Sequence, residues 1–185
     1  MKSFIKQLIL LTFLNITTIA KAATEIYFTP SRACERNIIK NIRAAKKSID
    51  IAVYSINNDN IISALNGAKR RKIKIRIITD RVQASGRSSK AIYLYEKGFD
   101  IKVHTKHRLE HNKFAVYDNH IVSTGSFNWT NPASNKNSEN CVFLTTKKIA
   151  KQYTERFEQL WELNDWNKSE KWFERKLDER EEKEN

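Results

Sequence analysis

Apolar and polar positions follow two different periods along the chain, and these periods predict an ordered series of strands and helices. Period-two alternation or a short apolar run, both typical of strands, occurs at residues 25–29, 48–55, 73–79, 99–104 and 140–145. Apolar residues three or four positions apart, typical of helices, occur at residues 33–47, 57–72, 90–97 and 147–163. Strands that alternate with helices early and then follow one another predict an α/β fold: a mixed sheet with helices on both faces.

The two ends of the chain differ from this pattern. Residues 1–22 begin with Lys2 and Lys6, continue through an apolar run from Leu8 to Leu14, and end in Ala-Lys-Ala. That order is typical of a cleavable export signal, and the run is shorter than the roughly 20 apolar residues of a membrane span. We therefore expect a secreted or periplasmic protein, with an uncleaved anchor as the alternative. Acids and bases alternate in residues 168–185, which predicts a charged, solvated C-terminal helix or tail.

The positive charge belongs to the segment between these ends, residues 23–167. The 185-residue chain carries a formal net charge of +13. Residues 1–22 hold three lysines and no acid, and residues 168–185 hold one acid in excess, which leaves +11 on the central domain. Such a domain favours a polyanionic partner, either nucleic acid or an anionic membrane surface. Charge alone does not choose between them.

Cysteine usage leaves one question open. The expected mature chain keeps Cys34 and Cys141. In an oxidising compartment the two residues can form a disulfide, but cysteine is also a common buried apolar residue. The sequence does not decide between these interpretations.

The strongest chemical pattern is a motif within residues 111–128. Six residues stand at the spacing H-x-K-x4-D-x6-G-S-x-N, namely His111, Lys113, Asp118, Gly125, Ser126 and Asn128. Side chains alternate between the faces of an extended segment, so we expect His111 and Lys113 on one face. Phe114 and Val116 then face the core. A histidine beside a fixed positive charge suits a phosphate, which gains negative charge when it is attacked.

The second half of the motif follows an apolar run at a predicted strand end. Gly125 allows the backbone to turn or to approach a ligand closely. Ser126 and Asn128 carry hydroxyl and amide groups that donate hydrogen bonds to phosphate oxygens. Taken together, the six residues predict a phosphate-directed site rather than an ordinary hairpin.

This motif resembles that of the phospholipase D superfamily, whose members break phosphodiester bonds. The resemblance implies an α-β-α sandwich around a mixed sheet, and no metal or other cofactor. It implies that Lys113 and Asn128 stabilise the phosphoryl oxygens, that Ser126 supports the loop, and that Asp118 orients neighbouring groups. Glu139 stands where bacterial nucleases of this superfamily have a glutamate that holds the nucleophilic histidine.

The resemblance also implies a second subunit. The reaction uses two histidines, one to attack phosphorus and one to protonate the leaving oxygen. Large members of the superfamily carry two copies of the motif, whereas this chain carries one. We therefore expect a homodimer with one composite site near a two-fold axis that passes close to His111.

Three functions remain open from the sequence. The runs Glu-His-Asn-Lys-Phe and Gly-Ser-Phe-Asn-Trp-Thr are similar to those of small secreted bacterial phospholipase D proteins, which favours phospholipid as substrate. A short, basic, single-motif domain also resembles the non-specific bacterial endonucleases of the superfamily. The third alternative is an inactive module that binds a polyanion; the intact motif argues against it.

Other polar clusters carry weaker signals. His104, His107 and His111 have helical spacing for a zinc site, but their flanks are extended and no cysteine or carboxylate completes the set. The basic cluster of residues 69–74 is either a phosphate-binding stripe or a solvated helix end. Asp80 either lines the site or caps a loop.

Overall fold

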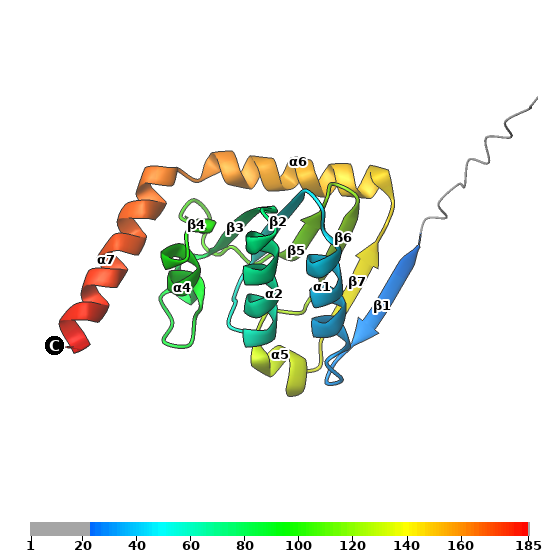
Figure 1. The fold of residues 1–185 in the computed structure, drawn as a ribbon, viewed down its shortest axis with the longest axis horizontal. Coiled ribbons are helices and arrows are strands. Elements are labelled where there is room, and N and C mark those ends of the chain that lie inside the picture. The colour runs from blue at the N-terminus through cyan, green and yellow to red at the C-terminus, as the bar shows by residue number, and fades with distance from the viewer. Residues whose placement is uncertain (1–22, 185) are drawn as a thin grey trace, which may run out of the picture.

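Seven strands form one mixed sheet in the order β1-β7-β6-β5-β2-β3-β4 (Figure 1). The computed structural model describes residues 23–184, so the predicted export signal lies outside the described residues. The strands are β1 (Thr24–Phe28), β2 (Ser48–Val53), β3 (Lys74–Asp80), β4 (Asp100–His104), β5 (Lys113–Tyr117), β6 (Ile121–Gly125) and β7 (Asn140–Leu144). Neighbours β2, β3 and β4 are parallel, and the other pairs are antiparallel.

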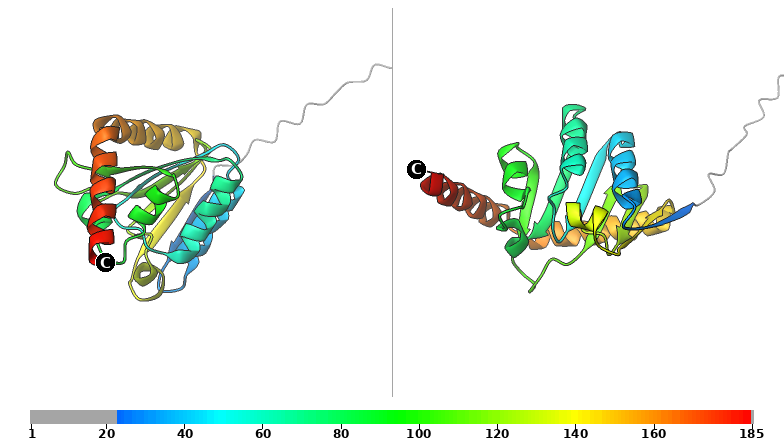
Figure 2. Two further views of the ribbon diagram at one scale, coloured as in Figure 1. Left: turned by 60° about the vertical axis from the view of Figure 1, so that its left-hand side comes forward. Right: turned by 90° about the horizontal axis from the view of Figure 1, so that it is seen from below.

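Helices cover both faces of this sheet, as the pattern predicts. They are α1 (Ala33–Ala44), α2 (Asp59–Arg70), α3 (Arg81–Ala84), α4 (Ala91–Glu96), α5 (Asn131–Asn135), α6 (Lys147–Leu163) and α7 (Trp166–Glu184). Figure 2 shows α1, α2 and α4 on one side and α6 lying along the other. The fold is therefore the expected α-β-α sandwich, with the short helices α3 and α5 in segments where no helix is predicted. Among the described helices, none is both long and apolar enough to cross a membrane.

The alternation of β5 divides its side chains between two cores. Ala115 and Tyr117 pack in the larger core under α1 and α2. Phe114 and Val116 pack in the smaller core under α6, together with Phe157 of that helix. The predicted inward orientation of Phe114 and Val116 is confirmed, and it leaves the strand's first residue, Lys113, free to serve the site.

Helix α1 ends three residues earlier than the apolar stripe predicts. The backbone amides of Lys46, Lys47 and Ser48 donate to the carboxylate of Asp118 at 2.7–3.0 Å. Because the Asp118 carboxylate accepts hydrogen bonds from these three amides, they do not continue the hydrogen-bond pattern of the helix. Tertiary contacts have therefore overridden a local helical pattern.

The C-terminal segment is a helix, one of the two forms expected for it, and its few apolar residues pack against the body of the protein. Trp172 and Phe173 are buried in the larger core, with exposed fractions of 7% and 0%. The ring of Phe173 stacks on that of Tyr95 in α4, with centroids 4.6 Å apart. Two adjacent aromatic residues are enough to dock a helix whose other positions are charged, so α7 belongs to the folded body.

A disulfide joins Cys34 in α1 to Cys141 in β7, with the two Cα atoms 5.8 Å apart. Both cysteines are buried. The question left open by the sequence is thus answered by the fold, which brings the two residues together across 107 positions of chain.

Candidate active site

The register of four adjacent strands assembles the motif at one edge of the sheet. Val53 of β2 pairs with Lys113 of β5, and Gly125 of β6 pairs with Cys141 of β7. The pairing of Ala115 with Ser123 places Lys113 level with Gly125. Residues just beyond these ends therefore meet. They are Tyr54, His111, Ser126 and Glu139.

His111 and Lys113 both lie against the ring of Tyr54. The His111 ring centroid is 4.6 Å from that of Tyr54, and the Lys113 ammonium is 4.9 Å from the Tyr54 centroid. Lys113 Nζ also donates to the His111 carbonyl at 2.6 Å. His111 precedes β5 rather than lying in it, yet the two side chains are brought together as predicted. Within residues 23–184, no hydrogen bond occupies either ring nitrogen of the exposed His111.

Burial and nearby carboxylates act on the pKa of Lys113 in opposite directions. Partial desolvation lowers the pKa of Lys113 below its ordinary value, while the negative charges of Glu139 and Glu110 act in the opposite direction. The two carboxylates thus favour the cation in a half-buried position. A cation held there is ready to receive a phosphoryl oxygen.

Glu139 holds Ser126 rather than His111. Its Oε2 accepts from the Ser126 hydroxyl at 2.6 Å, and its Oε1 accepts from Asn137 Nδ2 at 3.0 Å. The backbone amide of Asn140 donates to the same Ser126 hydroxyl. Both carboxylate oxygens are therefore engaged, and the hydrogen bond to His111 that the resemblance implies is absent from the described residues. The structure does show Ser126 joining its own loop to Glu139 and Asn140 through its hydroxyl group.

Gly125 is required by a close approach of two chains. Its φ of 145° suits glycine, and a Cβ there would lie 2.4 Å from the Asn140 carbonyl oxygen. That carbonyl accepts from the amides of Ser126 and Phe127 at 3.1 and 3.3 Å. The glycine therefore lets β7 clamp the loop that carries the rest of the motif.

Asn128 presents an unfilled polar atom to the site. Its side chain is half-buried, and its Oδ1 is the one buried side-chain polar atom of residues 23–182 without a hydrogen-bond partner. Buried polar atoms are almost always paired, so an unpaired one marks a position where a ligand or water completes the set. Oδ1 is an acceptor, so the group that completes it must be a donor such as water. The expected contact with a phosphate oxygen would come from the Asn128 Nδ2 donor instead.

Asp118 is not brought to this cluster. It follows the opposite end of β5 from Lys113, in the turn before β6, and its carboxylate binds the three amides that end α1. Burial would raise the pKa of Asp118, but the amide hydrogen bonds outweigh it and lower the pKa. The motif predicts Asp118 among the catalytic residues, as a group that orients its neighbours. In the structure its carboxylate instead binds the backbone between α1 and β2.

Comparison with known proteins decides the family. Residues 38–161 match the family model described as cardiolipin synthase, PLD-like domain. The phospholipase D of Rickettsia prowazekii is 31% identical over 152 residues, which cover 82% of this chain and 74% of the relative. The crystal structure of Nuc from Salmonella typhimurium, a phospholipase D family member, matches with a TM-score of 0.74 at 30% identity. That match covers 78% of this chain and 97% of Nuc. The protein belongs to the phospholipase D-like family.

Other relatives agree with this assignment. The mitochondrial cardiolipin hydrolase of Chlamydomonas reinhardtii is 30% identical over 120 residues, 65% of this chain and 54% of the relative. NucT from Helicobacter pylori shares the fold, with a TM-score of 0.71 at 24% identity over 78% of this chain. The phospholipase D-like domain is therefore a phosphodiesterase.

Sequence reasoning missed two residues that support this phospholipase D-like site, Tyr54 and Glu110, and left the role of Asp80 open. Tyr54 carries no motif signal, because an aromatic residue at a strand end is common. Asp80 Oδ1 accepts from the amides of Val82 and Gln83, so the interpretation as a loop cap is confirmed. Its Oδ2 also accepts from the amide of Glu110, whose buried carboxylate in turn holds Asn112 beside His111.

The remaining clusters lie away from the phospholipase D-like site or serve the fold. His104 is buried, its Nδ1 is 2.9 Å from Asn164 Nδ2, and its Nε2 accepts from the His107 amide. Across residues 23–184, no three His, Cys, Asp or Glu side chains gather as metal ligands. The basic residues 69–74 lie at the end of β3 opposite Asp80, where they close α2 as a solvated helix end.

A buried carboxylate under the site was also not predicted. Glu35 of α1 accepts hydrogen bonds from Arg32, Asn58 and Asn60. Burial would raise the pKa of Glu35, but the hydrogen bonds outweigh it and lower the pKa to about 2. The side-chain amide of Asn58 donates to Glu35, and its backbone amide donates to the carbonyl of Trp129, the residue after Asn128. Glu35 thereby supports the loop that presents Asn128.

Replacing Glu35 by glutamine should cost on the order of 3 kcal/mol of unfolding free energy at pH 7. The folded pKa lies below the unfolded value, so this contribution is present above pH ~4.5 and is lost as pH falls toward 2. Urea unfolding of both proteins between pH 7 and pH 3 should therefore show curves that converge in acid. The exposed Glu162, replaced by glutamine, is the control and should change little at any pH. A pH-independent gap for Glu35→Gln would contradict the assignment.

Proposed function

We propose that the protein is a secreted phospholipase D-type enzyme that hydrolyses head-group phosphodiester bonds of phospholipids through a phosphohistidine. The observation that carries this proposal is the shared placement of His111 and Lys113 on the Tyr54 ring, at the edge where Ser126 and Asn128 arrive. An imidazole without a hydrogen bond to any described residue, a half-buried cation and the Nδ2 donor of a side-chain amide at one edge provide a nucleophile and two groups for phosphoryl oxygens.

The proposed reaction has two steps. In the first, a ring nitrogen of His111 attacks phosphorus, a P–N bond forms, and the P–O bond to the head group breaks. A second histidine protonates the leaving oxygen, which departs as an alcohol. In the second step that histidine removes a proton from water, the oxygen attacks phosphorus, and the P–N bond breaks to release phosphatidate. Lys113 and Asn128 stabilise the charge on the phosphoryl oxygens in both steps.

We propose that the second histidine comes from a second copy of the chain. His104 is buried with both ring nitrogens engaged, and His120 lies in the turn at the opposite end of β5 from Lys113. His107 stacks on His104, with ring centroids 5.0 Å apart. A two-fold axis near His111 would supply a matching imidazole without any further residue of this chain.

Export and metal independence are part of the same proposal. The pattern of residues 1–22 supports export, and a buried disulfide is suited to an oxidising compartment. Lysine and histidine side chains from two subunits supply the positive charge that a metal ion provides in other phosphodiesterases.

An endonuclease is the second candidate, because the domain is strongly basic and Nuc from Salmonella typhimurium is a similar structure. The phosphate backbone of duplex DNA would bind to the positive charge of the domain. The nuclease would employ the same two-step chemistry, so only the substrate separates the two candidates.

Paired turnover assays test the proposal. Purified protein in EDTA is given phosphatidylcholine and phosphatidylglycerol vesicles in one arm, and plasmid and single-stranded DNA in the other. We expect head-group release from vesicles to exceed DNA nicking, and EDTA to leave the rate unchanged. Nicking without lipid turnover would make the protein a nuclease. Inactivity in both arms would leave only the polyanion-binding module.

A further inference from the structure

Two exposed aliphatic side chains lie beside the catalytic cluster. Val82 in α3 is 60% exposed, and Leu109 in the connection between β4 and β5 is 42% exposed. A single exposed apolar side chain needs no explanation, whereas two on neighbouring segments beside the site together form a small apolar surface. They come from different parts of the chain, so the fold rather than the local sequence places them together.

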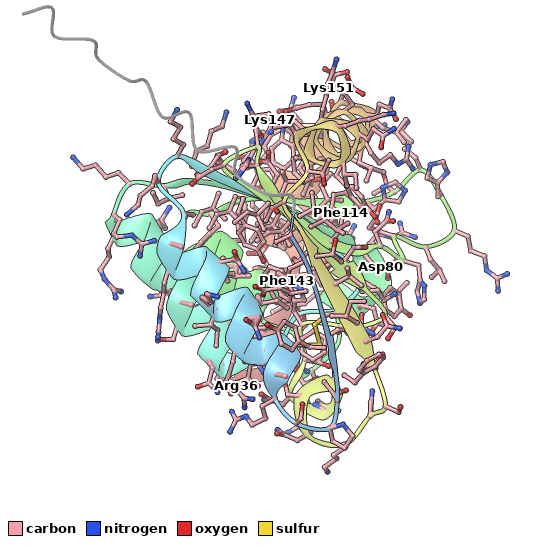
Figure 3. The ribbon with its side chains drawn as sticks, turned by 90° about the vertical axis from the view of Figure 1, so that its right-hand side faces the viewer. Arg36, Asp80, Phe114, Phe143, Lys147 and Lys151 are labelled. Atoms are coloured by element: carbon pink, nitrogen blue, oxygen red, sulfur yellow. A yellow bond between two sulfur atoms is a disulfide. The ribbon has the colours of Figure 1, made fainter. Side chains whose placement is uncertain are left out.

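The carboxylate of Asp80 joins the two segments. Its Oδ1 accepts from the Val82 amide at 2.9 Å, and its Oδ2 accepts from the Glu110 amide, next to Leu109, at 3.1 Å. Asp80 is itself only 2% exposed. One buried side chain therefore fixes the backbones that carry both aliphatic residues. Figure 3 shows Asp80 on the side of the molecule from which the β4–β5 connection projects.

The same segments are bonded to the catalytic cluster. Gln83, next to Val82, donates from Nε2 to the Tyr54 hydroxyl at 3.0 Å. Glu110, next to Leu109, precedes His111 and holds Asn112 through its carboxylate. The two segments that carry Val82 and Leu109 therefore adjoin Tyr54, the residue against which His111 and Lys113 lie.

The charges around the two aliphatic residues are all positive. Exposed cations occupy both segments, and within residues 23–182 none of them forms an ion pair: Arg81, Arg87, Lys106 and Arg108. The acids of the same segments, Asp80 and Glu110, are buried and hydrogen bonded. We call the surface of Val82, Leu109 and these four cations the cationic rim.

We propose that the cationic rim docks the enzyme on an anionic phospholipid bilayer, with Val82 and Leu109 entering the interface and the four cations binding lipid phosphates. Aliphatic side chains surrounded by Arg and Lys are the composition that binds such surfaces. This inference rests on the proposed function and names the physical form of its substrate: lipid in a membrane rather than dispersed lipid.

Two other occupants fit the rim less well. Single-stranded nucleic acid is bound through aromatic stacking, and the rim has aliphatic residues instead. A second copy of the chain that covered the rim would set the same unpaired cations against one another across a two-fold axis, where like charges repel. The dimer proposed above must therefore bring the two His111 residues together while leaving Val82 and Leu109 outside the subunit contact. Both occupants are outcomes that the experiment distinguishes.

The test uses the double variant Val82→Ser/Leu109→Ser in the full protein. Vesicles with and without phosphatidylglycerol measure binding by flotation and turnover by head-group release, and soluble bis(4-nitrophenyl) phosphate measures chemistry alone. We expect the ratio of vesicle turnover to soluble turnover to fall at least about tenfold, together with loss of vesicle binding. Binding of the wild type should require anionic lipid and weaken with salt. Leu163→Ser, at a 40% exposed position in α6, is the matched control and should keep the ratio.

An unchanged ratio with unchanged vesicle binding would overturn the proposal. A variant that dissociates from dimer to monomer in light scattering would assign the rim to a subunit interface, and one that loses DNA binding alone would assign it to nucleic acid. If the wild type cleaves the soluble diester and DNA but no vesicle lipid, the proposed function fails. Vesicle binding in the flotation experiment then tests the membrane-docking role of the rim independently of turnover.

Discussion

Replacing His111 by asparagine should lower phosphodiester turnover by about 10⁴-fold or more, because the proposed P–N bond forms to an imidazole nitrogen that asparagine lacks. The fold should survive, because the imidazole is exposed and no described residue hydrogen bonds to its ring nitrogens. The unfolding free energy should therefore change by less than about 0.5 kcal/mol. Rates on a soluble diester and urea unfolding of the same preparation measure both quantities.

His107→Asn is the matched control for this experiment, since His107 is also exposed but stacks on His104. It should keep most of its activity on the soluble diester. Brief reaction with a ³²P-labelled diester followed by denaturation should trap labelled protein in the wild type and not in His111→Asn. A labelled His111→Asn protein would place the nucleophile elsewhere. Loss of activity in His107→Asn would place the second histidine within the same chain.

Removing the disulfide should produce the largest loss of stability. The double variant Cys34→Ala/Cys141→Ala should unfold with about 4 to 5 kcal/mol less free energy, because the bridge closes a loop of roughly a hundred residues in the unfolded chain. Its activity should fall as well, because Cys141 directly follows Asn140, whose carbonyl holds the amides of Ser126 and Phe127.

Reductant supplies the control for the disulfide. Dithiothreitol added under unfolding conditions should bring the wild type close to the double variant, and it should leave the double variant unchanged. Urea midpoints with and without reductant measure this difference. Equal midpoints for oxidised wild type and double variant would show that the bridge contributes nothing to stability.

The sequence predicted the sheet and the placement of His111 and Lys113 because both depend on short-range rules. Residues 114–117 form a short, continuous apolar run, which is typical of a buried strand. Side chains alternate between the faces of any strand, so the orientation of Phe114 and Val116 follows from the strand assignment alone. The position of Asp118 was also open to prediction in hindsight. Five positions along a strand span roughly 16 Å, so a residue that far beyond Lys113 reaches the other end of the sheet.

Other features were beyond local rules. The partner of Glu139 depends on the register between β6 and β7, which places Ser126 within reach of the carboxylate. The docking of α7 depends on the contacts of Trp172 and Phe173 with residues distant in sequence, such as Tyr95, which the pattern of that segment does not specify. Tyr54 and Asp80 act through residues distant in sequence, and no spacing along the chain records such contacts.

The strand order has a consequence for the nascent enzyme. β1 is the first strand to be synthesised, yet it pairs only with β7, where Phe28 lies opposite Asn140 and Thr24 opposite Leu144. A chain that ends before Glu139 also lacks the two residues that hold Ser126, namely Glu139 and Asn140. We therefore expect incomplete, ribosome-bound chains to be inactive, because the site forms only after β7 has been synthesised and can pair with β1 and β6.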